Sequence, residues 1–132
     1  MRVILAALTA APILLTGVPA HAEAGPALID HVEWTDWQGL ASLRVYPLPA
    51  GRAAAARLGA TGDGERAWSE VLAQAPDAGS PGMREQFLCH WQYAELAQPG
   101  KTSWNLEPWR PVVDEATMLD AGCNPGAEEE PF

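Results

Sequence analysis

Five polar side chains that could take part in acid-base or charge-stabilising chemistry lie between residues 90 and 110. They are His90, Lys101, Asn105, Glu107 and Arg110. A carboxylate or an imidazole that its surroundings tune toward neutral pH can act as a general acid or base, and cationic side chains can stabilise developing charge. These five are therefore the candidate catalytic residues, and we expect Glu107 to face a ligand or water.

Each of these side chains also has an ordinary structural interpretation, which the sequence leaves open. Lysine and arginine at turns and strand ends usually stay solvated, and Asn105 can satisfy backbone groups at a bend. Glu107 can pair with Arg110 or Arg44 as a surface ion pair that contributes at most ~1 kcal/mol. Whether the polar side chains share one pocket decides between the two interpretations.

Aromatic side chains form the second candidate group. The sequence contains six tryptophans, more than a small core commonly needs, and aromatic residues are enriched at interfaces and stack on ligand rings. The candidate binding residues are Tyr93, Trp104 and Trp109. We therefore expect a disulfide-stabilised binding or effector module that docks an unknown protein or glycan through a tryptophan-rich surface. The alternative is a small secreted hydrolase of cell-envelope or extracellular polymers, with Glu107 as acid or base.

Several other classes of site are not predicted. Beyond residue 22 the sequence contains only two histidines, His31 and His90, and their spacing matches no metal-ligand motif, so we expect no metal and no cofactor. No glycine-rich phosphate loop or nucleophile elbow occurs. Seventeen acidic residues against eight basic ones give a net charge of −9, and this acidity argues against a nucleic-acid partner.

Cys89 and Cys123 are the two cysteines of the sequence. In a chain bound for an oxidising compartment, an even cysteine count favours a bond between them. Closing a loop of about 35 residues would stabilise the fold by about 4 kcal/mol in the chain-entropy model. The alternative makes Cys89 a nucleophile activated by a histidine, and it is weaker because the adjacent His90 cannot readily reach its neighbour's sulfur.

Composition divides the chain into four parts. Residues 1–22 are predicted to be a cleaved signal peptide, because a charged start, an apolar run and a small-x-small end follow one another. The apolar run is shorter than the ~20 residues that a membrane span requires. A short lead (23–27), a single globular domain (28–125) and an acidic flexible tail (126–132) follow. We expect a monomer that is extracellular or in the cell envelope, with no membrane insertion after signal removal.

Periodicity predicts a small α+β domain, an antiparallel sheet of two hairpins packed against two to three short helices, with one disulfide. Alternating apolar residues over 28–37 and 40–46 indicate the first hairpin. Apolar residues three and four apart indicate helices after Asp63 and after Ser80. A last short helix is predicted to begin at the N-cap Asp114.

Two further segments are ambiguous in the sequence. Residues 91–95 fit both a helical stripe and a strand, and we predict a strand because residues 104–108 offer it a hairpin partner. In that hairpin Trp104 and Leu106 would face the core. The alanine-rich segment 51–60 could add a short helical turn, but its glycines and the glycine cluster that follows favour a surface connection, which we predict.

Four motifs together resemble one known family. They are Met-Arg-Glu-Gln-Phe-Leu-Cys-His at 83–90, Lys101, Trp-Asn-Leu-Glu-Pro-Trp-Arg-Pro at 104–111, and Gly-Cys-Asn-Pro at 122–125. In this order, and over roughly residues 28–125, the chain is similar to the secreted, mainly actinobacterial domain-of-unknown-function family 2599. The resemblance implies export, the paired cysteines and the motif residues. It implies no mechanism, because the family has no established activity.

Overall fold

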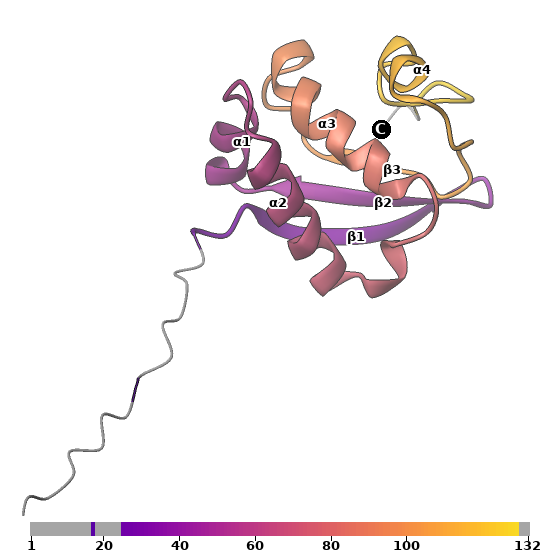
Figure 1. Cartoon of the computed structure of the whole chain (residues 1–132). Helices are drawn as coiled ribbons and strands as arrows, with labels where there is room; N and C mark the ends of the chain where they lie inside the picture. The colour runs from indigo at the N-terminus through magenta and orange to yellow at the C-terminus, as the bar shows by residue number, and fades with distance from the viewer. Residues whose placement is uncertain (1–16, 18–24, 130–132) are drawn as a thin grey trace, which may run out of the picture.

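The structure is a computed structural model that describes Gly17 and residues 25–129 (Figure 1). Apart from Gly17, the expected signal peptide lies outside the described residues, as do residues 130–132. A three-stranded antiparallel sheet and four α-helices make up the domain, which confirms the predicted small α+β class. Within the described part of the chain, no helix has the length and apolar character needed to cross a membrane.

The first two strands form the predicted hairpin. β1 (Ile29–Trp37) and β2 (Leu40–Pro47) pair antiparallel, and the connecting residues Gln38 and Gly39 have φ angles of 52° and 81°. Positive φ at both central residues is the geometry of a type I′ turn, whose twist matches the flanking strands. β3 (Trp104–Leu106) pairs antiparallel with β2, so the sheet order is β1-β2-β3.

The helical elements follow the hairpin in the sequence, and β3 lies between the third and fourth α-helices. The helical elements are α1 (Pro49–Ala55), α2 (Thr61–Gln74), the short 3-10 helix η1 (Pro76–Ala78), α3 (Met83–Ala97) and α4 (Glu115–Asp120). Figure 1 shows α4 apart from α1 and α2, and α4 contacts the domain through α3. The predicted N-cap of α4 is confirmed, because the carboxylate of Asp114 accepts a hydrogen bond of 2.8 Å from the N–H of Thr117.

Residues 49–55 form α1 where the sequence predicted a surface connection. Pro49 lies in the first turn, where its missing N–H costs nothing, and Ala54 and Ala55 are buried in the core. Small residues also allow a close approach, since a Cβ added to Gly51 would lie 2.1 Å from the carbonyl oxygen of Leu28. The prediction was wrong because alanines give only a weak apolar stripe although they can pack tightly.

Residues 91–95 belong to α3, so the predicted strand over this segment was wrong and there is no second hairpin. Met83, Phe87 and Trp91 form one buried helical stripe. The indole N–H of Trp91 donates to the backbone oxygen of Ala60 at 3.0 Å. These tertiary contacts favour the helical period over the alternating one. β3 therefore finds its partner in β2 instead.

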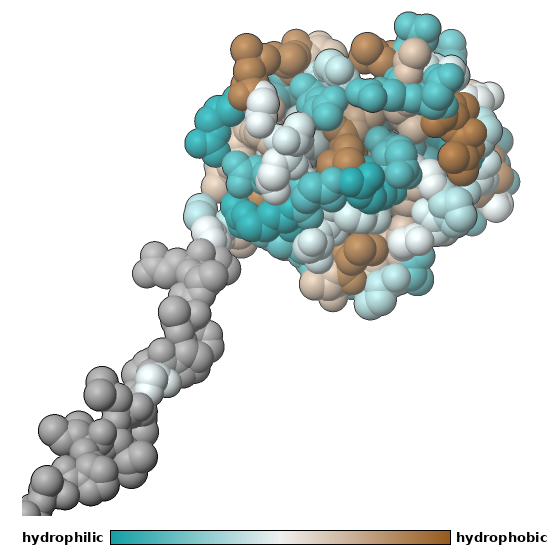
Figure 2. All heavy atoms as spheres, in the orientation of Figure 1, coloured by the Kyte–Doolittle hydropathy of each residue, from teal (hydrophilic) through white to brown (hydrophobic). Residues whose placement is uncertain are grey.

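An aromatic cluster fills the core between the helices and the sheet. The alternating residues of β2 and β3 that face it are Leu43, Val45, Trp104 and Leu106. From the helices come Trp68, Phe87 and Trp91, and the rings of Trp91 and Trp104 meet edge to face at 6.1 Å. Three of the six tryptophans are thus core residues. The remaining surface is mixed, and on the face in Figure 2 hydrophobic residues form separate patches among hydrophilic ones.

Candidate functional site

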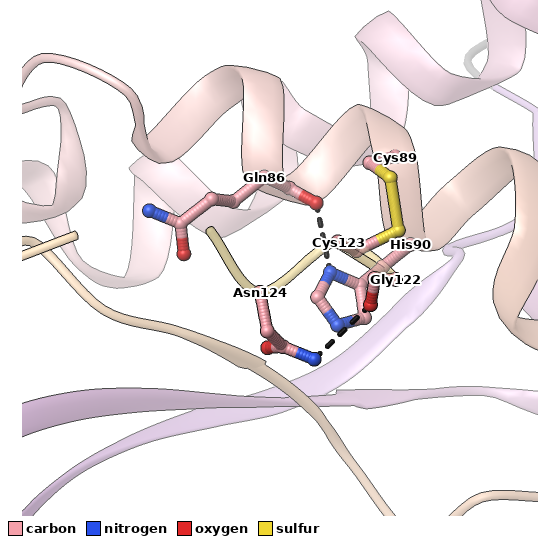
Figure 3. The surroundings of a disulfide bond; sticks show 6 residues. All are labelled: Gln86, Cys89, His90, Gly122, Cys123 and Asn124. Atoms are coloured by element: carbon pink, nitrogen blue, oxygen red, sulfur yellow. Dashed lines mark hydrogen bonds between the residues drawn. A yellow bond between two sulfur atoms is a disulfide. The ribbon is translucent and has the colours of Figure 1, made fainter. Parts of the chain in front are cut away.

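The predicted disulfide between Cys89 and Cys123 is confirmed. Their Cα atoms lie 5.6 Å apart, and neither cysteine is free, so Cys89 is not available as a nucleophile. Cys89 lies on α3, whereas Cys123 follows α4 with a φ of 68°. The bond brings residues 122–124 beside His90, the next residue of α3 (Figure 3).

His90 is a buried imidazole with one ring nitrogen engaged. Its Nδ1 lies 2.8 Å from the backbone oxygen of Gln86 (Figure 3). A carbonyl can only accept, so Nδ1 carries the proton and Nε2 keeps a lone pair. Burial lowers the pKa of His90 from 6.5 to about 4, and the positive charges of Lys101 and Arg110 act in the same direction. The ring is therefore neutral at pH 7, and Nε2 is a hydrogen-bond acceptor.

An open groove of about 470 Å³ runs beside His90. It lies between α3, the loop after α3, and residues 122–129, which we call the C-terminal segment. Its polar lining residues are His90, Tyr93, Gln98, Lys101, Asn124 and Glu129. Leu96 and Leu119 add apolar surface and are 61% and 46% exposed. The groove therefore combines an aromatic ring, apolar walls and several hydrogen-bonding groups.

Asn124 lines this groove and carries a buried, unmatched acceptor. Its Nδ2 donates to the backbone oxygen of Gly122 at 3.1 Å (Figure 3). Its Oδ1 is buried and has no hydrogen-bond partner among the described residues. Leaving a buried acceptor unpaired costs about 1–3 kcal/mol, so such an atom usually pairs with a water or a ligand. His90 and Asn124, which both line the groove, thus each carry an acceptor atom.

Lys101 and Glu129 form an ion pair on the groove wall, with side chains 18% and 27% exposed. The same carboxylate oxygen of Glu129 lies 3.4 Å from Nδ2 of Asn105. Asn105 is buried, and its Oδ1 accepts a hydrogen bond of 2.7 Å from the Ser103 hydroxyl, which holds its amide in place. Lys101 and Asn105 therefore present two donors to one carboxylate oxygen.

Glu107 does not line the groove and has no exposed surface. One carboxylate oxygen accepts from the Ser42 hydroxyl at 3.0 Å, and the other accepts from Nε of Arg110 at 2.7 Å. The side-chain amide of Gln86 pairs with both the backbone N–H and the backbone oxygen of Glu107, each at 2.9 Å. The expectation that Glu107 faces a ligand or water is therefore wrong, and the ion pair is a buried one.

Arg110 connects this buried pair to the C-terminal segment. Its side chain is fully buried, and Nη1 donates to the backbone oxygens of Pro125 and Ala127 at 3.2 and 2.5 Å. The guanidinium carbon also lies 4.5 Å from the centre of the Trp109 ring, within the range of a cation–π contact. Residues 126–129, the part of the expected flexible tail that the structure describes, thus include contacts to the domain.

The five candidate catalytic residues fall into two groups. His90 and Lys101 line the groove, and Asn105 reaches it through its contact with Glu129. Glu107 and Arg110 form the buried pair instead. No group of three or more histidine, cysteine or acidic side chains suited to a metal ion occurs among the residues that the structure describes.

The three candidate binding residues also differ in their surroundings. Tyr93 is half-buried and lines the groove, whereas Trp104 is fully buried in the core and offers no surface. Trp109 is half-buried beside Arg110. The exposed tryptophans are instead Trp34 and Trp37 on β1, 37% and 38% exposed. A continuous tryptophan-rich surface is therefore not formed by the predicted residues.

Sequence reasoning missed three polar residues of the groove, Gln98, Asn124 and Glu129. A signal for Asn124 was present, because it follows Cys123 just as His90 follows Cys89, and the disulfide brings these neighbours together. Glu129 had no such signal. It lies in an acidic run near the end of the sequence, which is typical of a solvated tail.

In comparisons with known proteins, the chain is similar to proteins that are described as uncharacterized. A family model described as protein of unknown function (DUF2599) matches residues 29–126. Uncharacterized proteins of Mycobacterium tuberculosis and Mycobacterium bovis are 62% identical over 107 residues, which cover 81% of this chain and 72% of each relative. An uncharacterized protein of Mycobacterium leprae is 48% identical over 101 residues, covering 76% of this chain and 81% of that protein. No solved structure matches.

Proposed function

The chain belongs to the family described as protein of unknown function (DUF2599). From that premise, we propose that it is an exported binding module stabilised by a disulfide. In this proposal the groove beside His90 holds a sugar unit of an extracellular glycan. The observation that carries the proposal is the open groove itself, whose lining brings together the ring of Tyr93 and the hydrogen-bonding side chains of His90 and Asn124. Sugar hydroxyl groups both donate and accept hydrogen bonds, so they suit such a lining.

The shape and lining of the groove support the same class of ligand. A volume of about 470 Å³ falls within the ~300–1,000 Å³ range of sites that bind small molecules. Tyr93 supplies an aromatic ring with a polar tip, and such rings can stack on a ligand while the hydroxyl forms a hydrogen bond. Leu96 and Leu119 add apolar surface near it. An amphipathic ring with several hydroxyl groups is complementary to this combination.

The disulfide supports the proposal in two ways, because it makes the groove rigid and because it is typical of exported proteins. Cys89 and Cys123 join α3 to the C-terminal segment, so the two walls that carry His90 and Asn124 are held in a fixed relation. A structural disulfide is typical of proteins in oxidising compartments, in agreement with the predicted signal peptide. A preformed site loses less conformational entropy when a ligand binds.

The alternative function, a small secreted hydrolase, has weaker support. Glu107 is fully buried and both of its carboxylate oxygens are hydrogen-bonded, so it is not placed to exchange a proton with a substrate. His90 is a poor general base near neutral pH because its pKa is about 4. Both features favour a binding role over a catalytic one.

The test is a titration of the purified full-length protein with D-glucose and N-acetyl-D-glucosamine, followed by NMR of the backbone amides. We expect shifts concentrated at His90, Tyr93 and Asn124. Tyr93→Ala should weaken binding by about tenfold or more, as aromatic anchors do. Tyr46→Ala is the matched control, because Tyr46 stacks on His31 of β1 and does not line the groove. An equal loss in both variants, or shifts confined to other surfaces, would contradict the proposal.

A further inference from the structure

We infer that the groove contains a carboxylate-binding subsite formed by Lys101 and Asn105, which the protein's own Glu129 occupies, so that the preferred ligand is an acidic sugar that displaces Glu129. This inference rests on the proposed function and deepens it, because it names the charge of the sugar. It also assigns a competitive role to the C-terminal segment.

The two donors of the subsite are built into the fold. Lys101 is the single lysine of a sequence whose net charge is −9, and its side chain is only 18% exposed. Asn105 is 1% exposed and is held by Ser103, so that Nδ2 remains for an outside acceptor. An ammonium and a fixed amide directed at one oxygen form a site for an anionic oxygen atom.

Glu129 fills this site in the manner of a ligand. Its Oε1 contacts both Lys101 Nζ and Asn105 Nδ2, and its side chain is 27% exposed to solvent. A partly exposed ion pair is weak because solvent competes for both charges. An external carboxylate can therefore replace it without leaving the lysine unpaired.

The attachment of the C-terminal segment permits this exchange. Arg110 donates to the backbone oxygens of Pro125, Ala127 and Glu128, and the side chain of Glu129 follows the last of these anchor points. The side chain of Glu129 can thus leave the subsite while the rest of the segment stays in place. The wall that carries Asn124 is separately fixed by the disulfide at Cys123.

An acidic sugar matches the whole groove better than an acidic peptide does. Its carboxylate would take the place of Glu129, while hydroxyl groups on the same ring would form hydrogen bonds with the side chains of His90 and Asn124, which line the same groove. A peptide carboxylate carries no such hydroxyl groups next to the charge. The observations therefore favour a uronic acid or a similar carboxylated sugar.

The experiment compares D-glucuronate, D-glucose and N-acetylglycine as probes of the purified full-length protein and three variants. Glu129→Gln should raise the affinity for glucuronate about fivefold, because it removes a competing ion pair of modest strength. The matched control is Glu128→Gln, which removes the same charge from an exposed neighbour that does not line the groove. It should change the affinity less than twofold. Lys101→Met should lower the affinity for glucuronate by a clearly larger factor than it lowers the affinity for glucose.

The outcomes separate this inference from the proposed function. Glucose binding that depends on Tyr93, combined with no preference for glucuronate in Glu129→Gln, would overturn the carboxylate subsite and leave the binding module intact. Equal gains in Glu129→Gln and Glu128→Gln would overturn the specific role of Glu129. Equal gains for N-acetylglycine and glucuronate would overturn the assignment to an acidic sugar. If no probe shifted the groove amides in any variant, both proposals would be wrong.

Discussion

Two ion pairs lie near β3 and the C-terminal segment, and they differ in burial. The side chains of Glu107 and Arg110 are both 0% exposed, whereas the side chains of Lys101 and Glu129 are 18% and 27% exposed. Each carboxylate oxygen of Glu107 already has a protein donor. The pair of Lys101 and Glu129 lines an open groove. Both pairs join a carboxylate to a cationic side chain. Solvent access distinguishes them, because the buried pair is structural and the partly exposed pair is exchangeable.

The largest expected effect comes from breaking the buried pair. Arg110→Met should lower the free energy of unfolding by about 3–5 kcal/mol, because it leaves the carboxylate of Glu107 buried without its charged partner. It also removes the donors to the backbone oxygens of Pro125 and Ala127. Urea unfolding at pH 7, followed by tryptophan fluorescence, measures this change.

The control for this variant is Arg84→Met. Arg84 pairs with Glu65, and their side chains are 47% and 48% exposed, so this change should cost less than about 1 kcal/mol. If Arg110→Met were no more destabilising than Arg84→Met, the buried pair would contribute nothing special, and the contrast between the two ion pairs would fail.

The fold was predictable where local signals agreed with tertiary packing. Alternation and the Gln38-Gly39 turn predicted the first hairpin, and Asp114 predicted the start of α4. Residues 91–95 were misassigned because Trp91 fits both a period of two and a period of 3.6 residues. The contacts of Trp91 with Ala60 and Trp104 decide for the helix, and such contacts between distant residues are not visible in a local pattern.

The candidate site was predictable in composition but not in arrangement. His90 and Lys101 were named from their residue types, and both line the groove. The pairing of Glu107 with Arg110 was considered, but as a surface ion pair, because nothing in the sequence indicates that Ser42 would also contact the carboxylate and that the pair would be buried. Its burial depends on three segments distant in sequence. Residue type thus suggested which side chains could act, while burial decided which of them can meet a ligand.

A smaller effect on the free energy of unfolding should appear when the pH is lowered, and it reports on the protonation of the buried His90 imidazole. The charges of Lys101, Glu129 and Arg110 all act on the pKa of His90, which burial lowers from 6.5 to about 4. Between these values the unfolded chain binds a proton that the folded protein does not. The His90 contribution to the free energy of unfolding should therefore be constant above pH 6.5 and about 2 kcal/mol lower at pH 5.

His90→Gln should remove this part of the pH dependence. The measurement is urea unfolding at pH 7 and pH 5, with His31→Gln as the control because His31 is exposed on β1. The difference in free energy between the two pH values should be smaller in His90→Gln by about 2 kcal/mol than in the wild type. An unchanged difference would mean that the folded protein protonates His90 as readily as the unfolded chain does.

The smallest expected effect on stability comes from the exchangeable pair, and it completes the comparison. In a double-mutant cycle of Lys101→Met and Glu129→Gln, urea unfolding should give a coupling free energy of at most about 1 kcal/mol, because solvent screens both charges. A small coupling is required if an external carboxylate is to replace Glu129 at modest concentration. A coupling above about 2 kcal/mol would place this pair in the same class as Glu107 and Arg110. Glu129 would then be a fixed part of the fold, and the groove would lack an anion subsite that a ligand could enter.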